Sequence, residues 1–256
     1  MSKRHKFLVS SLSLSLGFMG ITFLGNEDRL IGIALLTFGS IALFVWMLKE
    51  GLNWDATLLT LIMPPLFTLG VGLFWFLLPS TFYARLPVIA LYGIGIYSIA
   101  LTANVLSVSV LKKIALARAA KGVSFVLTLF TLFLLYDAVL SIKTSVVVSS
   151  LVIYLSSFFM FVQGLWVSRI TKYVGREVAL YSAIFSYIVS GIWFLLFFWP
   201  VTVVVGSLFL TVTVYMLLGL GQARIEGRLF RTTVNEYLIV GVAVFLVMML
   251  TTSWHG

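Results

Sequence analysis

Long runs of apolar residues, separated by short polar segments, fill almost the whole chain. Each run is roughly 20 residues long, the length of helix that crosses about 30 Å of hydrocarbon. None alternates apolar and polar residues as the strand of a membrane barrel does. The pattern therefore predicts an all-α, polytopic membrane helix bundle of about nine transmembrane helices. The predicted spans lie near residues 7–25, 30–48, 57–79, 86–111, 122–142, 145–167, 178–198, 201–221 and 236–252.

The composition favours a membrane protein for an independent reason. Of the 256 residues, 61% are hydrophobic and only 10% are charged, whereas a soluble domain usually has about 25% charged residues. A water-soluble fold would have too little polar surface to cover so much apolar side-chain area. We expect residues 1–256 to form a single transmembrane domain.

The placement of the basic residues predicts how the chain crosses the membrane. If the N-terminus is cytoplasmic, only Arg29, Arg85 and Lys143 of the 17 Lys and Arg residues fall in outer segments. Positive charge stays on the cytoplasmic side during insertion, so this pattern predicts N-in, C-out. Tryptophans near predicted span ends agree with it, because indole rings settle at the headgroup boundary. These tryptophans are Trp46, Trp54, Trp75, Trp166, Trp199 and Trp254, and Trp193 is the one that lies deeper.

Several sequence features concern single helix ends. The basic N-terminus resembles a signal peptide, but the first run lacks a small-residue cleavage site, so it predicts an uncleaved first span.

Pro64 and Pro65 inside span 57–79 predict a kink or break, either a packing kink or a hinge. Thr233 and Glu236 have the spacing of a capping box at the start of the last span. The turn at 199–200 is so short that spans seven and eight need not both cross fully.

Asp137 is the only acidic residue clearly inside a predicted span. An ionisable residue within a membrane is a candidate functional residue. It lies about 9 Å from the outer end of its span at about 1.5 Å per residue. It could reach the surface, pair with Arg85 or Lys143, or carry protons or substrate, and Ser141 shares its face.

Small polar residues also form stripes along helix faces. Span 145–167 carries a stripe with a period of seven, and span 178–198 carries Ser182, Ser186 and Ser190 with a period of four. Small residues and hydroxyls favour close helix packing, so the stripes predict either a tight seam between these two spans or a polar path or headgroup groove. The candidate polar path comprises Asp137, Ser141, Asn104, Tyr97, Ser149, Ser156 and Gln163.

Two inner segments mix basic and apolar residues, as segments at an anionic membrane surface do. We expect them to contact anionic lipid headgroups. A phosphate-bearing substrate or a partner membrane protein is the alternative. The candidate contacts are Lys112, Lys113, Arg118, Lys121, Arg224, Arg228 and Arg231. The net charge of +9 does not indicate nucleic acid, because the basic residues lie in short loops and form no basic domain.

The sequence contains little of what catalysis needs. The only histidines are the terminal His5 and His255, and there is no cysteine. Nucleophilic catalysis needs a base within reach, and metal-assisted hydrolysis needs ligands. We therefore predict no catalytic residues, no cofactor and no metal site. The lack of cysteine and of glycosylation sequons is consistent with a prokaryotic cytoplasmic membrane.

The stretch from Leu111 to Leu140, LKKIALARAAKGVSFVLTLFTLFLLYDAVL, resembles small multi-span bacterial membrane proteins with no assigned function. The resemblance covers one inner loop and one span and implies no activity. We interpret the chain as a non-enzymatic assembly, scaffold or accessory subunit that packs with partner membrane proteins. The alternatives are a small-solute or lipid transporter that uses the polar path, and an interfacial lipid-modifying enzyme.

Overall fold

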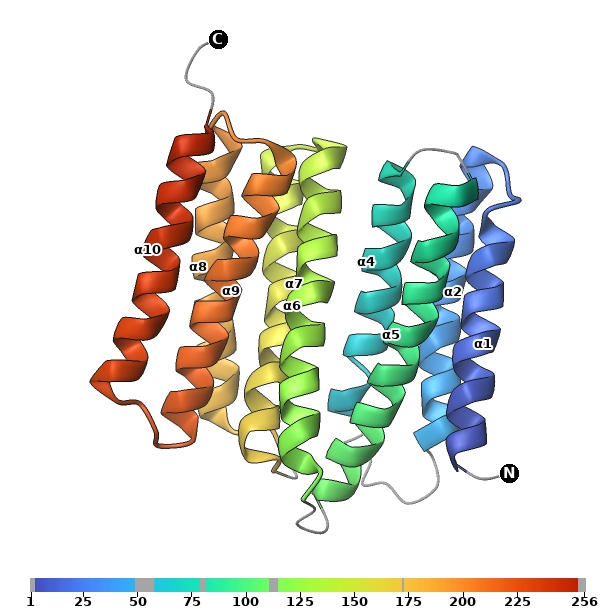
Figure 1. Ribbon diagram of the computed structural model, residues 1–256, viewed down its shortest axis with the longest axis horizontal. Coiled ribbons are helices and arrows are strands. Elements are labelled where there is room, and N and C mark those ends of the chain that lie inside the picture. The colour runs from blue at the N-terminus through green and yellow to red at the C-terminus, as the bar shows by residue number, and fades with distance from the viewer. Residues whose placement is uncertain (1–2, 49–57, 79–81, 111–114, 172, 253–256) are drawn as a thin grey trace. The chain divides into compact units, whose positions relative to one another are not determined.

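The structure is a computed structural model that describes residues 3–48, 58–78, 82–110, 115–171 and 173–252 (Figure 1). These residues form nine principal α-helices and no strand, which confirms the predicted fold class. The helices are α1 (Lys3–Ile21), α2 (Asn26–Leu48), α4 (Met63–Leu77), α5 (Phe82–Ser109), α6 (Ala117–Ile142), α7 (Val146–Arg169), α8 (Arg176–Phe197), α9 (Val203–Ile225) and α10 (Arg231–Thr251).

Among the described residues, eight segments are long and apolar enough to cross a membrane, and they match the predicted spans one by one from the second to the ninth. A helix is suited to this environment because it satisfies its own backbone hydrogen bonds where no water is present. The first predicted span, 7–25, corresponds to α1, which begins earlier with Lys3 and Arg4 and is not among the eight. The crossing of α1 therefore stays a prediction.

The starts of α4 and α10 differ from the starts that the apolar runs alone predict. Pro64 and Pro65 lie in the first turn of α4, after a bend at 61–62 that follows the helical residues 58–60. A proline there sacrifices no backbone hydrogen bond, because the first N–H groups of a helix have no intrahelical partner. The prediction that Thr233 and Glu236 cap the last helix is wrong, because α10 already begins at Arg231 without a side-chain cap. The helix therefore begins in polar sequence, before the apolar run starts.

The contacts divide the chain into two compact units, and each is described by itself. Unit 1 comprises Met1–Thr131 and Ile170–Tyr173, and therefore α1, α2, α4, α5 and the first half of α6. Unit 2 comprises Leu132–Arg169 and Val174–Gly256, and therefore the end of α6 and α7 to α10. The expectation of a single domain stays a prediction.

Aromatic rings from three helices fill the core of unit 1. Phe18 of α1 lies 4.9 Å from Tyr92 of α5 between ring centroids, and Phe67 of α4 stacks on the same tyrosine at 5.9 Å. Trp75 meets Phe18 edge-on at 6.0 Å. The hydroxyls of Tyr92 and Thr68 are 3.0 Å apart. Such ring pairs add about 0.5–1.5 kcal/mol each beyond their buried area.

Glycines allow the helices of unit 1 to approach closely. The ring of Phe67 occupies the place that a Cβ atom on Gly95 of α5 would take. At three more glycines a neighbouring side chain occupies the position that a Cβ atom would take: Leu36 at Gly17, Ile33 at Gly72 and Ser15 at Gly93. These pairs join α1 to α2, α2 to α4 and α1 to α5. Small residues serve this purpose in membrane bundles, where helix association depends on packing and not on water exclusion.

Unit 2 uses the same device reciprocally between α7 and α9. Leu218 of α9 would lie 2.8 Å from a Cβ atom on Gly164 of α7, and Leu165 of α7 would lie 2.7 Å from one on Gly221 of α9. The amide of Gln222 also donates a hydrogen bond to the carbonyl oxygen of Gly164 at 2.9 Å. Each helix therefore presents both a leucine and the space that receives one.

Helix α10 is joined to α9 by a second reciprocal pair. Tyr237 of α10 occupies the position that a Cβ atom on Gly219 of α9 would take. In return, Met216 of α9 occupies the position that a Cβ atom on Gly241 of α10 would take. The rings of Tyr237 and Tyr215 are 5.1 Å apart. The remaining faces of α10 are exposed, with Leu250 at 85% exposure. In a water-soluble protein such a face would be costly, whereas lipid tails accept it.

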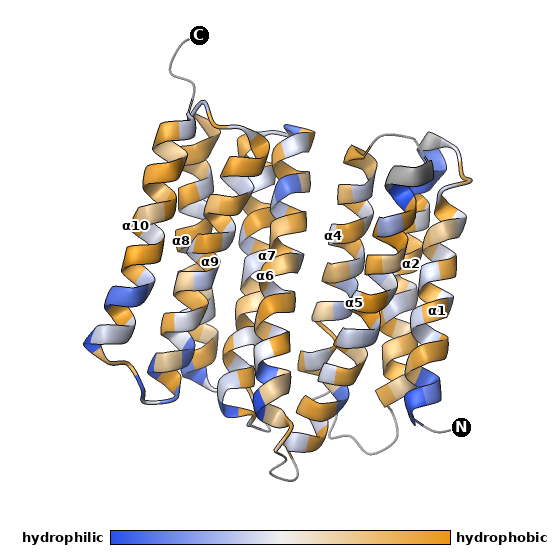
Figure 2. Ribbon diagram, viewed as in Figure 1, coloured by the Kyte–Doolittle hydropathy of each residue, from blue (hydrophilic) through white to orange (hydrophobic). Residues whose placement is uncertain are grey.

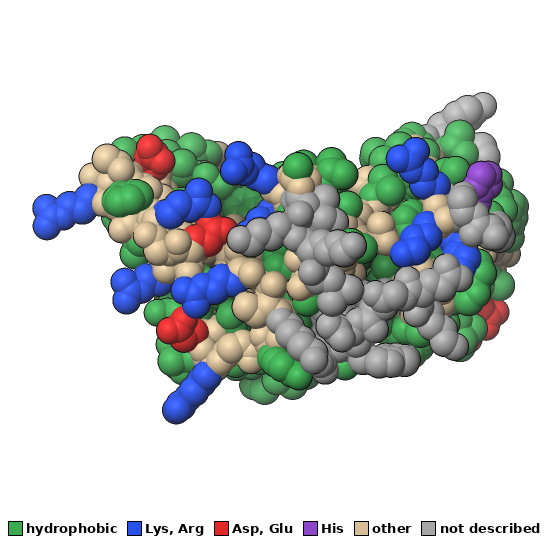
Figure 3. Space-filling model, turned by 90° about the horizontal axis from the view of Figure 1, so that it is seen from below, with side chains coloured by type: hydrophobic (Ala, Val, Ile, Leu, Met, Phe, Trp, Pro, Cys, Tyr) green, Lys and Arg blue, Asp and Glu red, His purple; other side chains and the backbone are tan. Residues whose placement is uncertain are grey.

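Hydrophilic residues collect at the helix ends and apolar residues fill the middle of each helix (Figure 2). In unit 2 one end carries Arg169, Arg176, Arg224, Arg228 and Arg231, while Lys143 is the only Lys or Arg described at the other end. Figure 3 is a view onto the basic ends of the helices, where Lys and Arg side chains are interspersed with a few acids. This separation of charge agrees with the distribution of basic residues in the sequence.

Not all the tryptophans near helix ends face outward. Trp46 is 45% exposed, but Trp75 and Trp166 are each only 1% exposed. The guanidinium of Arg85 lies 4.2 Å from the Trp75 ring centre, and that of Arg29 lies 5.6 Å away. Trp75 therefore packs inside unit 1, and its position near a helix end reflects contacts with protein groups.

Candidate functional site

Asp137 lies on the last turns of α6 and is buried within unit 2 at 5% exposure. The hydroxyl of Ser207 on α9 donates a hydrogen bond to its Oδ1 atom at 3.2 Å. Among the ion pairs formed by described residues, none involves Asp137. Within unit 2 the carboxyl group therefore neither reaches the surface nor pairs with Lys143. It connects two helices inside the bundle.

A second polar link lies one residue earlier on α6. The hydroxyl of Tyr136 is 2.6 Å from that of Ser157 on α7, and both residues are fully buried. Ser141, one turn after Asp137, is half-buried. Buried polar groups need such partners, because an unpaired one costs about 1–3 kcal/mol. The end of α6 is thus attached to α7 and α9 by hydrogen bonds.

The serine stripes of α7 and α8 lie inside unit 2. Helix α7 makes its most extensive contact with α8. Ser182 and Ser186 of α8 are fully buried and donate to the carbonyl oxygens four residues earlier. Ser190 donates across to the carbonyl oxygen of Ser150 on α7 at 3.0 Å. These contacts correspond to the packing seam, which was one of the two interpretations of the stripes.

The seven candidate path residues are divided between the two units. Tyr97 and Asn104 lie half-buried on α5 in unit 1, and Tyr97 lines a mainly apolar groove beside α1. The other five belong to unit 2, where Ser149, Ser156 and Gln163 of α7 are all buried. The Oε1 atom of Gln163 has no hydrogen-bond partner.

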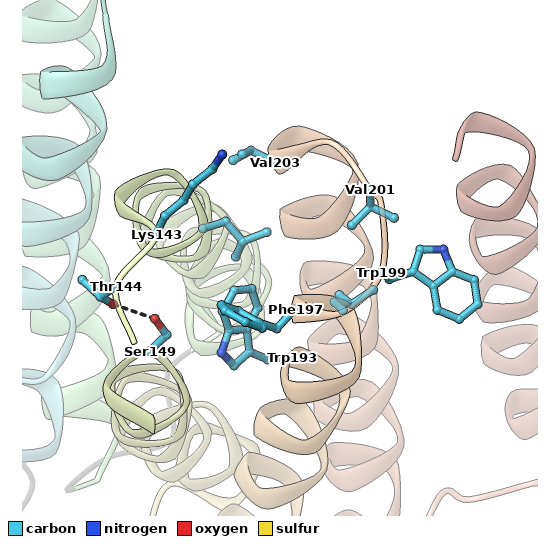
Figure 4. Close-up of a pocket in the computed structure, with 10 residues that line it drawn as sticks. Lys143, Thr144, Ser149, Trp193, Phe197, Trp199, Val201 and Val203 are labelled. Carbon is cyan, nitrogen blue, oxygen red and sulfur yellow. Dashed lines mark hydrogen bonds between the residues drawn. The ribbon is translucent and has the colours of Figure 1, made fainter. Parts of the chain in front are cut away.

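A pocket of about 260 Å³ opens at the end of unit 2 where α6, α7, α8 and α9 meet their connecting turns (Figure 4). We call it the Trp193 pocket. It is lined by Leu140, Lys143, Thr144, Ser149, Trp193, Leu196, Phe197, Trp199, Val201 and Val203. Of the candidate path residues, only Ser149 lines it, and Asp137 does not.

The polar groups of the Trp193 pocket are mostly hydrogen-bond donors. Trp193 is 5% exposed, and its indole N–H is buried without a partner. Figure 4 shows that nitrogen turned toward Ser149, whose hydroxyl is 2.7 Å from that of Thr144. Lys143 stands at the rim and is the only charged residue in the part of the lining that the structure describes. The pocket can therefore hold a group that accepts hydrogen bonds and carries negative charge.

A second pocket, of about 360 Å³, lies at the basic end between α9 and α10. Its lining includes Gln222, Tyr237 and the ion-paired residues Glu226 and Arg228. The hydrogen bond to Glu226 raises the pKa of Arg228, so this guanidinium stays charged. The charge of Arg228 is partly offset by its own neighbour, which weakens its attraction for an external anion.

The other predicted headgroup contacts are less constrained. Arg118, Arg224 and Arg231 are exposed and Lys121 is half-buried. Lys112 and Lys113 lie outside the described residues. Among the described residues, no group of three or more His, Cys, Asp or Glu could hold a metal ion.

One family matches almost the whole chain. It is described as a protein of unknown function, DUF5656, and the match covers residues 10–251. The chain belongs to this family. The comparisons with curated proteins and with solved structures found no match. Membership of DUF5656 confirms the resemblance to proteins with no assigned function and adds no activity or site residue.

Sequence reasoning missed the parts of unit 2 that are most informative. Trp193 was noted only as an exception to the tryptophan belt, although a deep tryptophan must find a partner for its N–H. The paired glycines were not recognised, because the side chain that fills each one comes from another helix. A list of glycines within predicted spans would have identified the positions but not their partners.

Proposed function

We propose that this protein is a non-enzymatic, multi-span membrane protein that packs against a partner membrane protein as an assembly, scaffold or accessory subunit. The observation that carries this proposal is Gly191 in the last third of α8. A Cβ atom added to Gly191 would meet nothing within 4 Å. A glycine inside a helix costs up to about 1 kcal/mol relative to alanine, so a helical glycine usually has a packing reason.

Every other glycine within the helices of unit 2 has such a reason. A neighbouring side chain fills the place beside Gly164, Gly206, Gly219, Gly221 and Gly241. Gly191 is the exception among them, and the residues around it on α8 are large, apolar and outward-facing. Tyr187, Phe194 and Leu195 are 73%, 49% and 65% exposed. This combination supports docking of an apolar transmembrane helix whose large side chain fits beside Gly191.

A photo-crosslinking experiment tests the proposal. A photoreactive phenylalanine analogue placed at Tyr187 is expected to link the protein to one discrete partner in native membranes, because this position borders Gly191. The same analogue at Leu250, an exposed apolar position on α10, serves as the control and should give no discrete product. Introducing Gly191→Leu should reduce the Tyr187 crosslink at least tenfold.

The proposal fails if Tyr187 and Leu250 give the same products, since both would then only sample lipid and random encounters. It also fails if Gly191→Leu leaves the crosslink unchanged. The circular dichroism melting temperature of the purified Gly191→Leu variant should equal or slightly exceed that of the wild type, because the added side chain meets no neighbour and leucine favours the helix more than glycine does.

A transporter of small solutes or lipids is the second candidate, and the buried hydrogen bond between Asp137 and Ser207 favours it. An ionisable group inside a membrane protein is costly and usually functional. Asp137→Asn preserves the size and the capacity to bond Ser207 but removes the charge. If Asp137 carries protons or substrate, uptake into reconstituted vesicles should fall at least tenfold while the melting temperature stays the same. Equal uptake by wild type and variant would refute this candidate.

We further propose that the protein lies in a prokaryotic cytoplasmic membrane with its N-terminus inside. The exposed Arg224 and Arg231, with Arg228 beside them, would then meet anionic headgroups of the inner leaflet. An interfacial enzyme has less support. The nearest acids, Glu177 and Glu226, are both in ion pairs with arginines, while Glu50 and Asp55 lie outside the described residues.

A further inference from the structure

We propose that the Trp193 pocket binds the phosphate group of an anionic phospholipid. This site lies at the end of unit 2 opposite Arg224, Arg228 and Arg231, so it is separate from the basic segments. It also does not depend on the partner that we propose for Gly191. The inference rests on an unpaired donor, on the chemistry of the rim and on the apolar part of the lining.

The unpaired donor is the indole N–H of Trp193. Its side chain is more than nine-tenths buried, and the nitrogen has no partner although it is directed toward the polar side of the pocket (Figure 4). Leaving a buried donor unsatisfied is unfavourable. A phosphate oxygen in the pocket would accept this hydrogen bond.

Ser149 and Thr144 offer a second donor. Their hydroxyl oxygens are 2.7 Å apart, so one hydroxyl donates to the other. The pair has two hydroxyl hydrogens and this bond uses one, which leaves the second for a ligand. The polar side of the pocket thus supplies donors, while carboxylates are absent from its described lining.

Lys143 supplies the charge and occupies an unusual backbone conformation. It follows the last residue of α6 with φ at +49°, a left-handed position where glycine or asparagine is normally found. A lysine there has a conformational cost that its exposed side chain does not offset within the protein. A function for the ammonium group at the rim explains why lysine occupies this position.

The rest of the lining favours a lipid over a free anion. Leu196, Phe197 and Val201 are among the apolar residues that line the pocket. A volume of about 260 Å³ is below the roughly 300–1,000 Å³ of pockets that enclose whole ligands. The pocket therefore suits a headgroup whose acyl chains remain outside in the bilayer. Its place at helix ends corresponds to the depth of lipid headgroups.

The test uses the full chain, purified in a neutral detergent. Short-chain phosphatidylglycerol should raise the melting temperature by several degrees, because a ligand that binds only the folded state stabilises it. Phosphatidylcholine of the same chain length should give a smaller shift, and inorganic phosphate should give none at equal concentration.

Trp193→Phe should weaken phosphatidylglycerol binding about tenfold or more, as expected when a hydrogen bond to a charged group is lost. Trp199→Phe is the matched control. Trp199 also lines the pocket, but its ring points away toward α10 and its N–H already donates to Thr252 at 3.3 Å. Lys143→Asn should weaken binding as well, since asparagine accepts the left-handed backbone but carries no charge.

The proposal is overturned if phosphatidylglycerol does not raise the melting temperature, or if inorganic phosphate raises it equally. It is also overturned if Trp193→Phe and Trp199→Phe bind the lipid with the same affinity. Misfolding cannot be mistaken for lost binding, because the lipid-free melting temperature is measured for each variant. Trp193→Phe should stay close to the wild type in that measurement, because removal of an unpaired buried donor offsets the smaller buried ring.

Discussion

Replacing Gly221 with leucine is expected to lower the free energy of unfolding by about 3 kcal/mol, the upper part of the range for overpacked cores. A Cβ atom at this position would lie 2.7 Å from Leu165 of α7 and 2.7 Å from Phe185 of α8. Leu165 is fully buried, so its side chain has little space into which it can move. The added side chain must therefore separate α9 from both neighbours at once.

Unfolding by a denaturing detergent, followed by tryptophan fluorescence, measures this change. Gly191→Leu is the control, because it introduces the same side chain into a helix of the same unit where no atom is near. It should raise the free energy of unfolding by less than about 1 kcal/mol, because leucine has a higher helix propensity than glycine. Equal destabilisation by the two leucines would show that the close packing around Gly221 is not what holds the three helices together.

A double-mutant cycle at Phe67 and Gly95 is expected to reveal strong coupling in unit 1. Phe67→Ala alone should lower the free energy of unfolding by about 2–3 kcal/mol. This is near or below the low end of the losses in soluble cores, because lipid tails are as apolar as the protein interior. Gly95→Ala alone should lower the free energy of unfolding by about 2 kcal/mol, because the Phe67 ring occupies the place of the new methyl group.

In the double variant the clash is absent, because the ring is gone and the methyl group enters the vacated space. The combined loss should therefore be smaller than the sum of the single losses by about 1–3 kcal/mol, the usual coupling of residues in contact. The same unfolding assay measures all three variants. Simple additivity would mean that Phe67 and Gly95 do not share the space that the structure assigns to them. Gly95→Ala combined with Leu250→Ala, two positions in different units, is the control and should be additive.

The positions of the spans could be predicted because a single physical requirement sets them. A helix that crosses the hydrocarbon needs about 20 apolar residues, and eight of the predicted runs coincide with helices of the structure. Helix ends were harder, because hydrogen bonding extends beyond the apolar run. The last helix starts at Arg231, and α1 starts at Lys3, both within polar sequence.

The candidate sites could be predicted only in part. The sequence singles out Asp137 as an acid within a span, but its partner Ser207 follows 70 residues later, and no local pattern relates them. The serine stripes of α7 and α8 were recognised, because their period lies within one helix. The Trp193 pocket was not, because its lining comes from four helices and two turns whose proximity depends on the tertiary structure.

The reciprocal pairs of glycine and large side chain place a constraint on how this sequence can diverge. Enlarging Gly164 without shortening Leu218 is excluded by the space between α7 and α9, and the same holds for Gly221 and Leu165. Change at these positions must therefore proceed through coordinated replacements, or through an intermediate of reduced stability. Within a family defined by sequence alone, correlated sizes at these paired positions would be an inherited signature of the helix arrangement.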